Sequence, residues 1–208
     1  MAHLVKLHDN NPDPRKVQEV IRTLDNNGLI VCPTDTVYSF AAKLGSPKGF
    51  DRLARAKGVK PEKAQFSLLC ADLSDLSRYA THISNPLFKM MKRALPGPYT
   101  FVLPASGEVP KLYKGKKKTI GIRVPDHPVA QHVLRELGSP LIVSSVHDQD
   151  AMREYTTDPE LILERHNHLV DLVVDGGMGN LEASTVLDCT GSEPEVLREG
   201  LGPVDDLF

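Results

Sequence analysis

The stretch LIVCPTDTVYSF, residues 29–40, joins a short apolar run to a cluster of hydroxyl and carboxylate side chains. The run LIVC predicts a buried strand, which ends at Pro33 because proline cannot donate a hydrogen bond to a sheet. Thr34, Asp35 and Thr36 follow directly. Side chains of these types often hydrogen-bond their own backbone, so the stretch taken alone predicts only a turn after a strand.

Helical and strand-like patterns alternate along the rest of the chain. Residues 13–28 predict a helix because Asp13 can cap it, Pro14 suits its first turn, and apolar residues recur at i, i+3, i+4 and i+7. Further helices are predicted at 46–58, 85–97, 127–140 and 158–170. Strands are predicted at 29–32, 66–71, 99–105, 118–125, 141–146, 171–177, 184–189 and 195–200. This order indicates one α/β domain over residues 1–208, with a large mixed sheet flanked by helices.

The composition narrows the class of protein. The 208 residues are 40% hydrophobic and 25% charged, as in ordinary globular proteins. No apolar run approaches about 18 residues and no apolar segment follows the N-terminus, so we expect neither a membrane span nor a secretory signal. Cys32, Cys70 and Cys189 lie far apart in apolar stretches, which is typical of reduced thiols in a cytoplasmic protein. Because the net charge is −2, a polyanion would have to bind a local patch.

Hydroxyl and basic side chains recur at the ends of the predicted strands. Ser145 closes the strand at 141–146, and Ser184 opens the strand at 184–189. Thr119 and Arg123 fall on one face of a single strand. Small polar ligands commonly bind at such strand ends in α/β sheets. Hydroxyls combined with basic groups suit a phosphate or carboxylate ligand.

Several common site motifs are missing. The chain has no G-x-x-x-x-G-K-[ST] and no G-x-G-x-x-G, so neither a P-loop nor a dinucleotide fingerprint is expected. It has no C-x-x-C pair, and HNH at residues 166–168 falls on a predicted solvated helix. We therefore expect no metal site built from the protein's own residues.

A basic run, KLYKGKKKT, occupies residues 111–119. Charge runs usually form solvated loops. The alternative is contact with RNA phosphates through Lys114, Lys116, Lys117 and Lys118, which would make binding fall with salt. The sequence favours neither interpretation over the other.

Five separated motifs together resemble the YrdC-like family. They are PTDTVYSF (33–40), PGPYTFVL (96–103), TIGIRVPDHP (119–128), STVLD (184–188) and VLREG (196–200). The resemblance extends from about residue 29 to residue 202. It implies a twisted α/β sheet with a basic concave face, suited to double-stranded RNA and nucleotides, and no additional C-terminal domain after Phe208.

The resemblance also implies an activity. Characterised members make threonylcarbamoyl-adenylate from L-threonine, bicarbonate and ATP, and they release pyrophosphate. The product serves the modification of an adenosine next to the anticodon of certain tRNAs. We would expect Mg²⁺ to accompany the ATP.

By resemblance, Thr36 would hold threonine, with Thr34 and Tyr38 lining the same pocket. Arg123 would bind the threonine carboxylate, and Ser184 would contact threonine.

By resemblance, nucleotide binding falls to Lys57, Thr119, Ser145, His147 and Arg198. Lys57 belongs to a K-x-R phosphate signature, and Arg198 would contact the ATP phosphates. Lys57 and Arg123 are the residues expected to be catalytic.

Three positions depart from the family pattern. Val59 stands where the K-x-R signature has arginine, His147 where an S-x-N signature has asparagine, and Ser39 where glycine follows the first motif. These departures resemble the YciO-type branch. They leave two hypotheses: a threonylcarbamoyl-adenylate synthase, or a paralogue that binds RNA or a nucleotide without efficient synthesis. A pocket for another amino acid or carboxylate is a third.

Overall fold

The computed structural model describes residues 2–114, 117–146, 156–205 and 207. Within them the strands are β1 (His3–Lys6), β2 (Ile30–Cys32), β3 (Ser39–Lys43), β4 (Ser67–Leu69), β5 (Tyr99–Pro104), β6 (Thr119–Arg123), β7 (Leu141–Ser145), β8 (Leu172–Asp175), β9 (Thr185–Asp188) and β10 (Glu195–Arg198). The helices are α1 (Pro14–Asp25), α2 (Pro47–Ala56), α3 (Ser74–Tyr79), α4 (Asn85–Ala94), α5 (Pro128–Leu137) and α6 (Pro159–His166), with the short 3-10 helices η1 (Pro61–Lys63) and η2 (Lys111–Tyr113).

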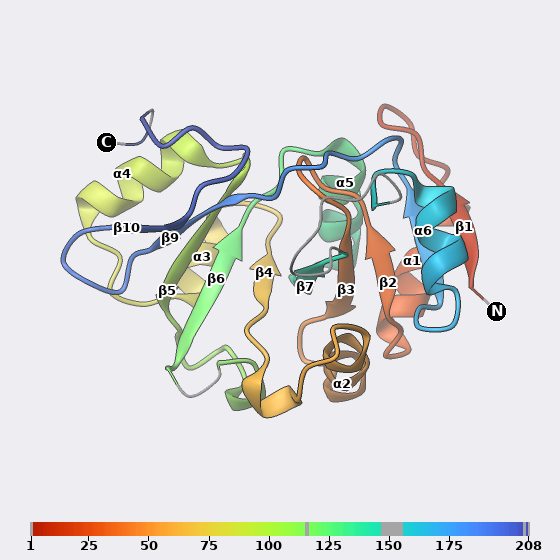
Figure 1. Cartoon of the computed structure of the whole chain (residues 1–208), viewed down its shortest axis with the longest axis horizontal. Coiled ribbons are helices and arrows are strands. Elements are labelled where there is room, and N and C mark those ends of the chain that lie inside the picture. Colours follow the sequence, from red (N-terminus) through yellow and green to blue (C-terminus); the bar gives the residue numbers. More distant parts are fainter. Residues whose placement is uncertain (1, 115–116, 147–155, 206, 208) are drawn as a thin grey trace.

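All ten strands belong to one sheet in the order β1-β8-β2-β3-β7-β4-β6-β5-β9-β10. The sheet is mixed, because it contains parallel pairs such as β4 with β6 and antiparallel pairs such as β5 with β6. Figure 1 shows the strand direction rotating strongly from β2 and β3 to β9 and β10. The predicted α/β fold with a twisted mixed sheet flanked by helices is therefore confirmed.

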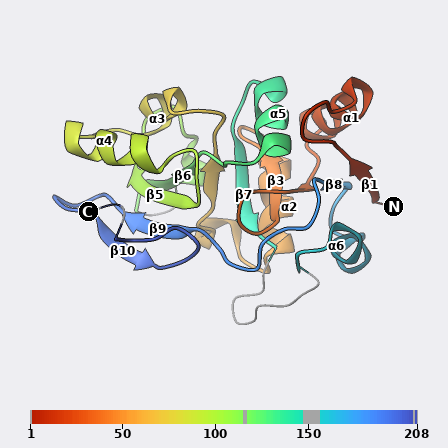
Figure 2. The same cartoon turned by 90° about the horizontal axis from the view of Figure 1, so that it is seen from above.

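Helices cover the sheet on both sides. Figure 2 shows α1, α3, α4 and α5 along one face and α6 on the other. The apolar stripe of α1 is buried against the sheet, and its start is capped by Asp13, whose carboxylate accepts a hydrogen bond from the Arg15 amide at 2.9 Å. Since buried apolar area supplies most of the driving force for folding, these stripes explain why the helices dock as they do.

Each predicted helix and strand is present, and five further elements were not predicted: β1, β3, α3 and the short 3-10 helices η1 and η2. The strand β1 has only four residues, and α3 has six, so neither is long enough for its apolar pattern to be distinguished from the surrounding sequence. The strand β3 follows the threonine-rich turn directly, and its sequence SFAAK has two alanines, which favour strands weakly.

Two connections bring distant strands to one place. The turn after β2 leads into β3, and the segment 176–184 carries the chain from β8 across the sheet to β9 (Figure 1). The two connections meet where the Asn180 amide donates to the Thr36 carbonyl at 2.9 Å. Among the described residues, no helix has the length and apolarity that crossing a membrane requires.

Candidate active site

A cavity of about 1260 Å³ lies over the central strands of the sheet. Its lining comes from β3, β7, β4, β6, β5, β9 and β10. Many of the lining residues carry hydroxyl groups, among them Ser39, Ser67, Thr100, Thr119, Ser144, Ser145 and Ser184. A cavity of this size and polarity suits a ligand with many hydrogen-bonding groups.

The turn after β2 places Thr36 in the cavity wall. The Thr34 hydroxyl accepts a hydrogen bond from the Thr36 amide at 3.1 Å and donates to the Val37 carbonyl at 2.8 Å. The turn interpretation of this stretch thus holds for Thr34, whose side chain is buried within the turn. Thr36 and Val37 line the cavity, whereas Thr34 supports them from behind.

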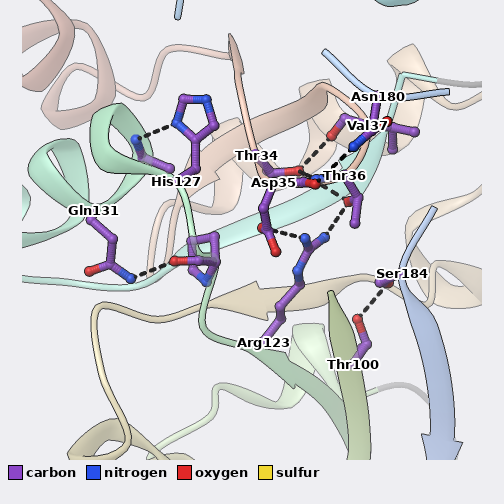
Figure 3. Close-up of polar contacts among 12 residues, drawn as sticks. Thr34, Asp35, Thr36, Val37, Thr100, Arg123, His127, Gln131, Asn180 and Ser184 are labelled. Carbon is purple, nitrogen blue, oxygen red and sulfur yellow. Dashed lines mark hydrogen bonds and ion pairs between the residues drawn. The ribbon is translucent and has the colours of Figure 1, made fainter. Parts of the chain in front are cut away.

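Arg123 crosses from β6 to this turn, as Figure 3 shows. Its guanidinium donates to the Thr36 hydroxyl at 2.6 Å and to the Asp35 carboxylate at 2.5 Å. The residue is only 6% exposed and lines the cavity. Arg123 Nε and Asp35 Oδ2 are buried and have no hydrogen-bond partner within the described part of the chain.

Burial and the ion pair act on Arg123 in opposite directions. Burial lowers the pKa of the guanidinium, while the charge and hydrogen bond of Asp35 raise it again. Because the pKa of an arginine side chain ordinarily lies far above neutral pH, Arg123 remains a cation near pH 7. The wall of the cavity near Thr36 therefore carries the guanidinium cation of Arg123, which is paired on one side with the Asp35 carboxylate.

A second polar group closes the cavity beside β9. The Ser184 and Thr100 hydroxyls are 2.9 Å apart, and both residues are buried (Figure 3). Arg198 on β10 donates from Nε and Nη2 to the Ser184 carbonyl, at 3.1 and 2.6 Å. Burial lowers the pKa of Arg198. Its guanidinium thus lines the cavity while it fixes the backbone of Ser184.

Thr119 and Ser145 also line the cavity, together with Ser39. Ser39 and Ser145 are directly opposite each other in the β3–β7 pair. The hydroxyl at position 39, where the family has glycine, therefore adds to the hydroxyl floor.

Tyr38 and Lys57 do not line the cavity. Tyr38 is fully buried; its hydroxyl donates to the Gly177 carbonyl at 2.7 Å and accepts from the Gly176 amide at 3.2 Å. Burial raises the pKa of the Tyr38 phenol. Tyr38 thus anchors the start of the segment 176–184. The Lys57 ammonium group donates to the Ser145 carbonyl at 2.9 Å, at the end of β7.

The basic run borders the same cavity. Lys114, Lys117 and Lys118 line it, although the Lys114 ammonium group is bound to the Ser106 carbonyl. Lys116 and His147 lie outside the described residues. The lysines therefore lie beside the hydroxyl floor and do not form a separate basic face.

Several residues of the site were not singled out from sequence. Asp35 fixes Arg123, Thr100 orients Ser184, and Asn180 holds the Thr36 carbonyl. Gly121 lies in the floor, where a β-carbon would meet Ser67 Oγ at 2.5 Å. Asp35 belongs to the motif PTDTVYSF and Thr100 to PGPYTFVL. Their roles were not predicted because their partners, Arg123 and Ser184, are distant in sequence.

Comparison with known proteins shows the family to which the chain belongs. The Sua5/YciO/YrdC family model, described as Telomere recombination, matches residues 22–200. YciO of Escherichia coli (strain K12) is 38% identical over 206 residues, 98% of each chain. The crystal structure of E. coli YciO has a TM-score of 0.91 and 36% identity over all of both chains. The chain belongs to the Sua5/YciO/YrdC family, and its resemblance to the YciO-type branch is confirmed.

Synthases of the same family are more distant relatives. The threonylcarbamoyl-AMP synthase of Bacillus subtilis (strain 168) is 29% identical over 198 residues, which are 94% of this chain but 55% of the relative. P. abyssi Sua5, solved in complex with L-threonine, has a TM-score of 0.87 and 25% identity, covering 98% of this chain and 59% of that one. The chain thus spans little more than half of these longer relatives.

Proposed function

We propose that this protein is a threonylcarbamoyl-AMP synthase, which joins L-threonine, bicarbonate and ATP and releases pyrophosphate. The observation that carries the proposal is the buried guanidinium of Arg123 in the cavity wall, held by Thr36 and Asp35. A buried arginine with donors to spare is well suited to a carboxylate, because its fork matches the two carboxylate oxygens. The relationship to synthases, and to a Sua5 structure with L-threonine, supports that ligand.

Threonine would lie between Arg123 and Ser184. Arg123 would bind the carboxylate. Thr36 and Ser184 line the cavity wall, and the fully buried Thr36 holds Arg123 through its hydroxyl. Both hydroxyls are already oriented, one by Arg123 and the other by Thr100. Groups held in advance lose little entropy when a ligand binds.

The reaction needs positioning more than covalent catalysis. The threonine amine and bicarbonate form a carbamate with loss of water, and the carbamate oxygen attacks the α-phosphorus and displaces pyrophosphate. Phosphoryl-type transfer of this kind depends on alignment and on neutralising charge. Thr119 and Arg198 also line the cavity, and they would contact the nucleotide.

Mg²⁺ would accompany ATP. No cluster of three or more histidine, cysteine, aspartate or glutamate side chains that could hold a metal occurs among the described residues. Glu62 and Asp188 line the cavity, however, and Mg²⁺ is commonly held by one or two carboxylates together with phosphates. The ion would neutralise phosphate charge during the transfer.

The test is pyrophosphate release from ATP in the presence of bicarbonate and Mg²⁺, with and without L-threonine. Arg123→Lys keeps a positive charge but loses the fork, so threonine-dependent release should fall at least about 100-fold. Arg135→Lys, a change at an exposed arginine of α5, should leave the rate unchanged. Equal release with and without threonine would reject the proposal, and release specific to another amino acid would reassign the substrate.

A second candidate function is RNA binding without efficient synthesis. Lys117 and Lys118 at the cavity border favour it, and so does the loss of arginine at Val59. Replacing both lysines by alanine should then weaken binding of tRNA or duplex RNA and reduce its salt dependence. If the wild-type protein binds neither RNA at low salt, this candidate is excluded.

A further inference from the structure

Neither position of the K-x-R signature, Lys57 and Val59 in this chain, lines the cavity. Lys57 does not line the cavity, and its ammonium group is bound to the Ser145 carbonyl at 2.9 Å. Val59, at the arginine position of the signature, packs against the apolar core. This part of the chain therefore presents no strong phosphate-binding pair to the cavity.

Three other lysines line the cavity instead. Lys63 ends η1, and Lys117 and Lys118 directly precede β6. All three residues are exposed, and no hydrogen bond or ion pair within the described ranges occupies their ammonium groups. Lys114 differs, because its ammonium group is already bound to the Ser106 carbonyl.

The strand β6 separates Lys117 and Lys118 from Arg123 by a fixed length. Thr119 and Arg123 both line the cavity at opposite ends of β6, four residues apart, which corresponds to roughly 13 Å of extended strand. Between them lies Gly121, where a β-carbon would meet Ser67 Oγ at 2.5 Å and Thr100 Cγ2 at 3.2 Å. The floor between Arg123 and the lysines is thus low at Gly121, with the side chains of Ser67 and Thr100 beside it.

Carboxylates also lie at the lysine end. Glu62 and Asp188 line the cavity there, and Asp188 accepts hydrogen bonds from the Thr190 amide and hydroxyl, which lower its pKa. Three lysines outnumber the two carboxylates, so this end keeps a net positive charge. It can hold an anionic group that is separate from the one at Arg123.

We propose that the polyphosphate of the nucleotide is bound by Lys63, Lys117 and Lys118, and not by Lys57. This inference rests on the proposed function and assigns its phosphate-binding residues. A ligand with a carboxylate at Arg123 and phosphates at the three lysines would lie along β6, over Gly121. Lysine ammonium groups bind phosphate as point charges, so they need no arginine-like fork.

Calorimetric titration with ATP and with AMP tests the assignment, using the folded full-length chain. The double variant Lys117→Ala/Lys118→Ala should bind ATP at least about tenfold more weakly, whereas its affinity for AMP should change less than about threefold. Lys63→Ala should weaken ATP binding in the same sense. Lys57→Ala should have little effect. Lys111→Ala is the matched control, because Lys111 is exposed in the same basic run but does not line the cavity.

The possible outcomes separate this inference from the proposed function. If Lys57→Ala abolishes ATP binding and the double variant does not, the inference is wrong and the synthase proposal stands. If the double variant loses affinity for ATP and for AMP equally, the inference is also wrong, because the two lysines would then not contact the β- and γ-phosphates that only ATP carries. If the wild-type protein binds no ATP, the synthase proposal itself fails.

Discussion

The guanidinium of Arg123 donates a 2.6 Å hydrogen bond to the hydroxyl of Thr36, a residue 87 positions earlier in the chain. The contact joins the first family motif to the third at the wall of the cavity. Asp35 completes the arrangement by pairing with the same guanidinium. Three buried groups thus hold one another in place before any ligand arrives.

Arg123→Ala should destabilise the fold as well as the site. Removing one partner of a buried ion pair leaves the other charge unpaired, which costs about 3–5 kcal/mol. The side chains of Arg123 and Asp35 are 8% and 11% exposed, so solvent cannot compensate fully. Urea unfolding of the wild type and the variant measures the difference.

The double variant Arg123→Ala/Asp35→Asn provides the control. It removes the unpaired charge as well, so it should recover part of the lost stability. If the second change instead adds a further loss equal to its effect alone, the two residues are not energetically coupled.

Thr100→Val should raise the KM for threonine without changing kcat. The substitution removes the hydroxyl that lies 2.9 Å from Ser184 Oγ, so Ser184 would lose its fixed orientation. A net hydrogen bond of about 1 kcal/mol corresponds to roughly a fivefold change. Steady-state kinetics over a threonine series measures it.

The matched control is Thr23→Val on α1, where the hydroxyl donates to the Glu19 carbonyl at 2.9 Å and the residue does not line the cavity. That variant should keep the wild-type KM. A Thr100→Val enzyme with unchanged KM would show that Ser184 does not bind threonine.

Gly121→Ala should destabilise the protein by about 1–3 kcal/mol, because a β-carbon there would overlap the Ser67 hydroxyl and crowd Thr100. Gly107→Ala is the control, since no atom lies within 4 Å of its β-carbon position. Urea unfolding measures the free energy of unfolding of both variants and of the wild type. Equal stability of the two would mean that the floor of the cavity can relax around a methyl group.

His127 should make stability depend on pH. Its Nδ1 accepts a hydrogen bond from the Ala130 amide at 3.5 Å at the start of α5, and burial lowers its pKa below the usual value of about 6.5, against the opposing charges of Asp9, Asp35 and Asp126. The unfolded chain then binds the proton more readily, so the stabilising contribution is present above about pH 6.5 and is lost as the pH falls.

His127→Asn keeps a helix-capping side chain but removes this titration. Unfolding free energies at pH 7, 6 and 5 should therefore fall less steeply in the variant than in the wild type. Identical slopes would show that the pH dependence arises elsewhere.

Most helices and strands could be predicted from the sequence because helix caps and apolar periodicity are local features. Asp13 and Pro14 mark the start of α1, and apolar periodicity marks its buried face. The strand β3 was not predicted, because its sequence SFAAK follows the turn directly and contains a serine and two alanines, which are weak strand formers. Its pairing with β7 stabilises it, and pairing between distant strands cannot be read from local pattern.

The site was predicted in part for the same reason. Alternation along β6 was enough to place Thr119 and Arg123 on one face. The sequence pattern did not predict that the Tyr38 hydroxyl bonds Gly176 and Gly177 and does not line the cavity. That contact depends on the path of a segment 138 residues later in the chain. The role of Asp35 likewise depends on Arg123, far along the chain.

We propose above all that the protein condenses threonine, bicarbonate and ATP in this cavity. The most direct measurement is mass spectrometry of the product formed from L-threonine, ¹³C-labelled bicarbonate, ATP and Mg²⁺. We predict an adenylate that contains threonine and one ¹³C atom, and whose formation is lost in Arg123→Lys. ATP turnover without incorporation of the label, or a labelled product that persists in Arg123→Lys, would contradict the claim.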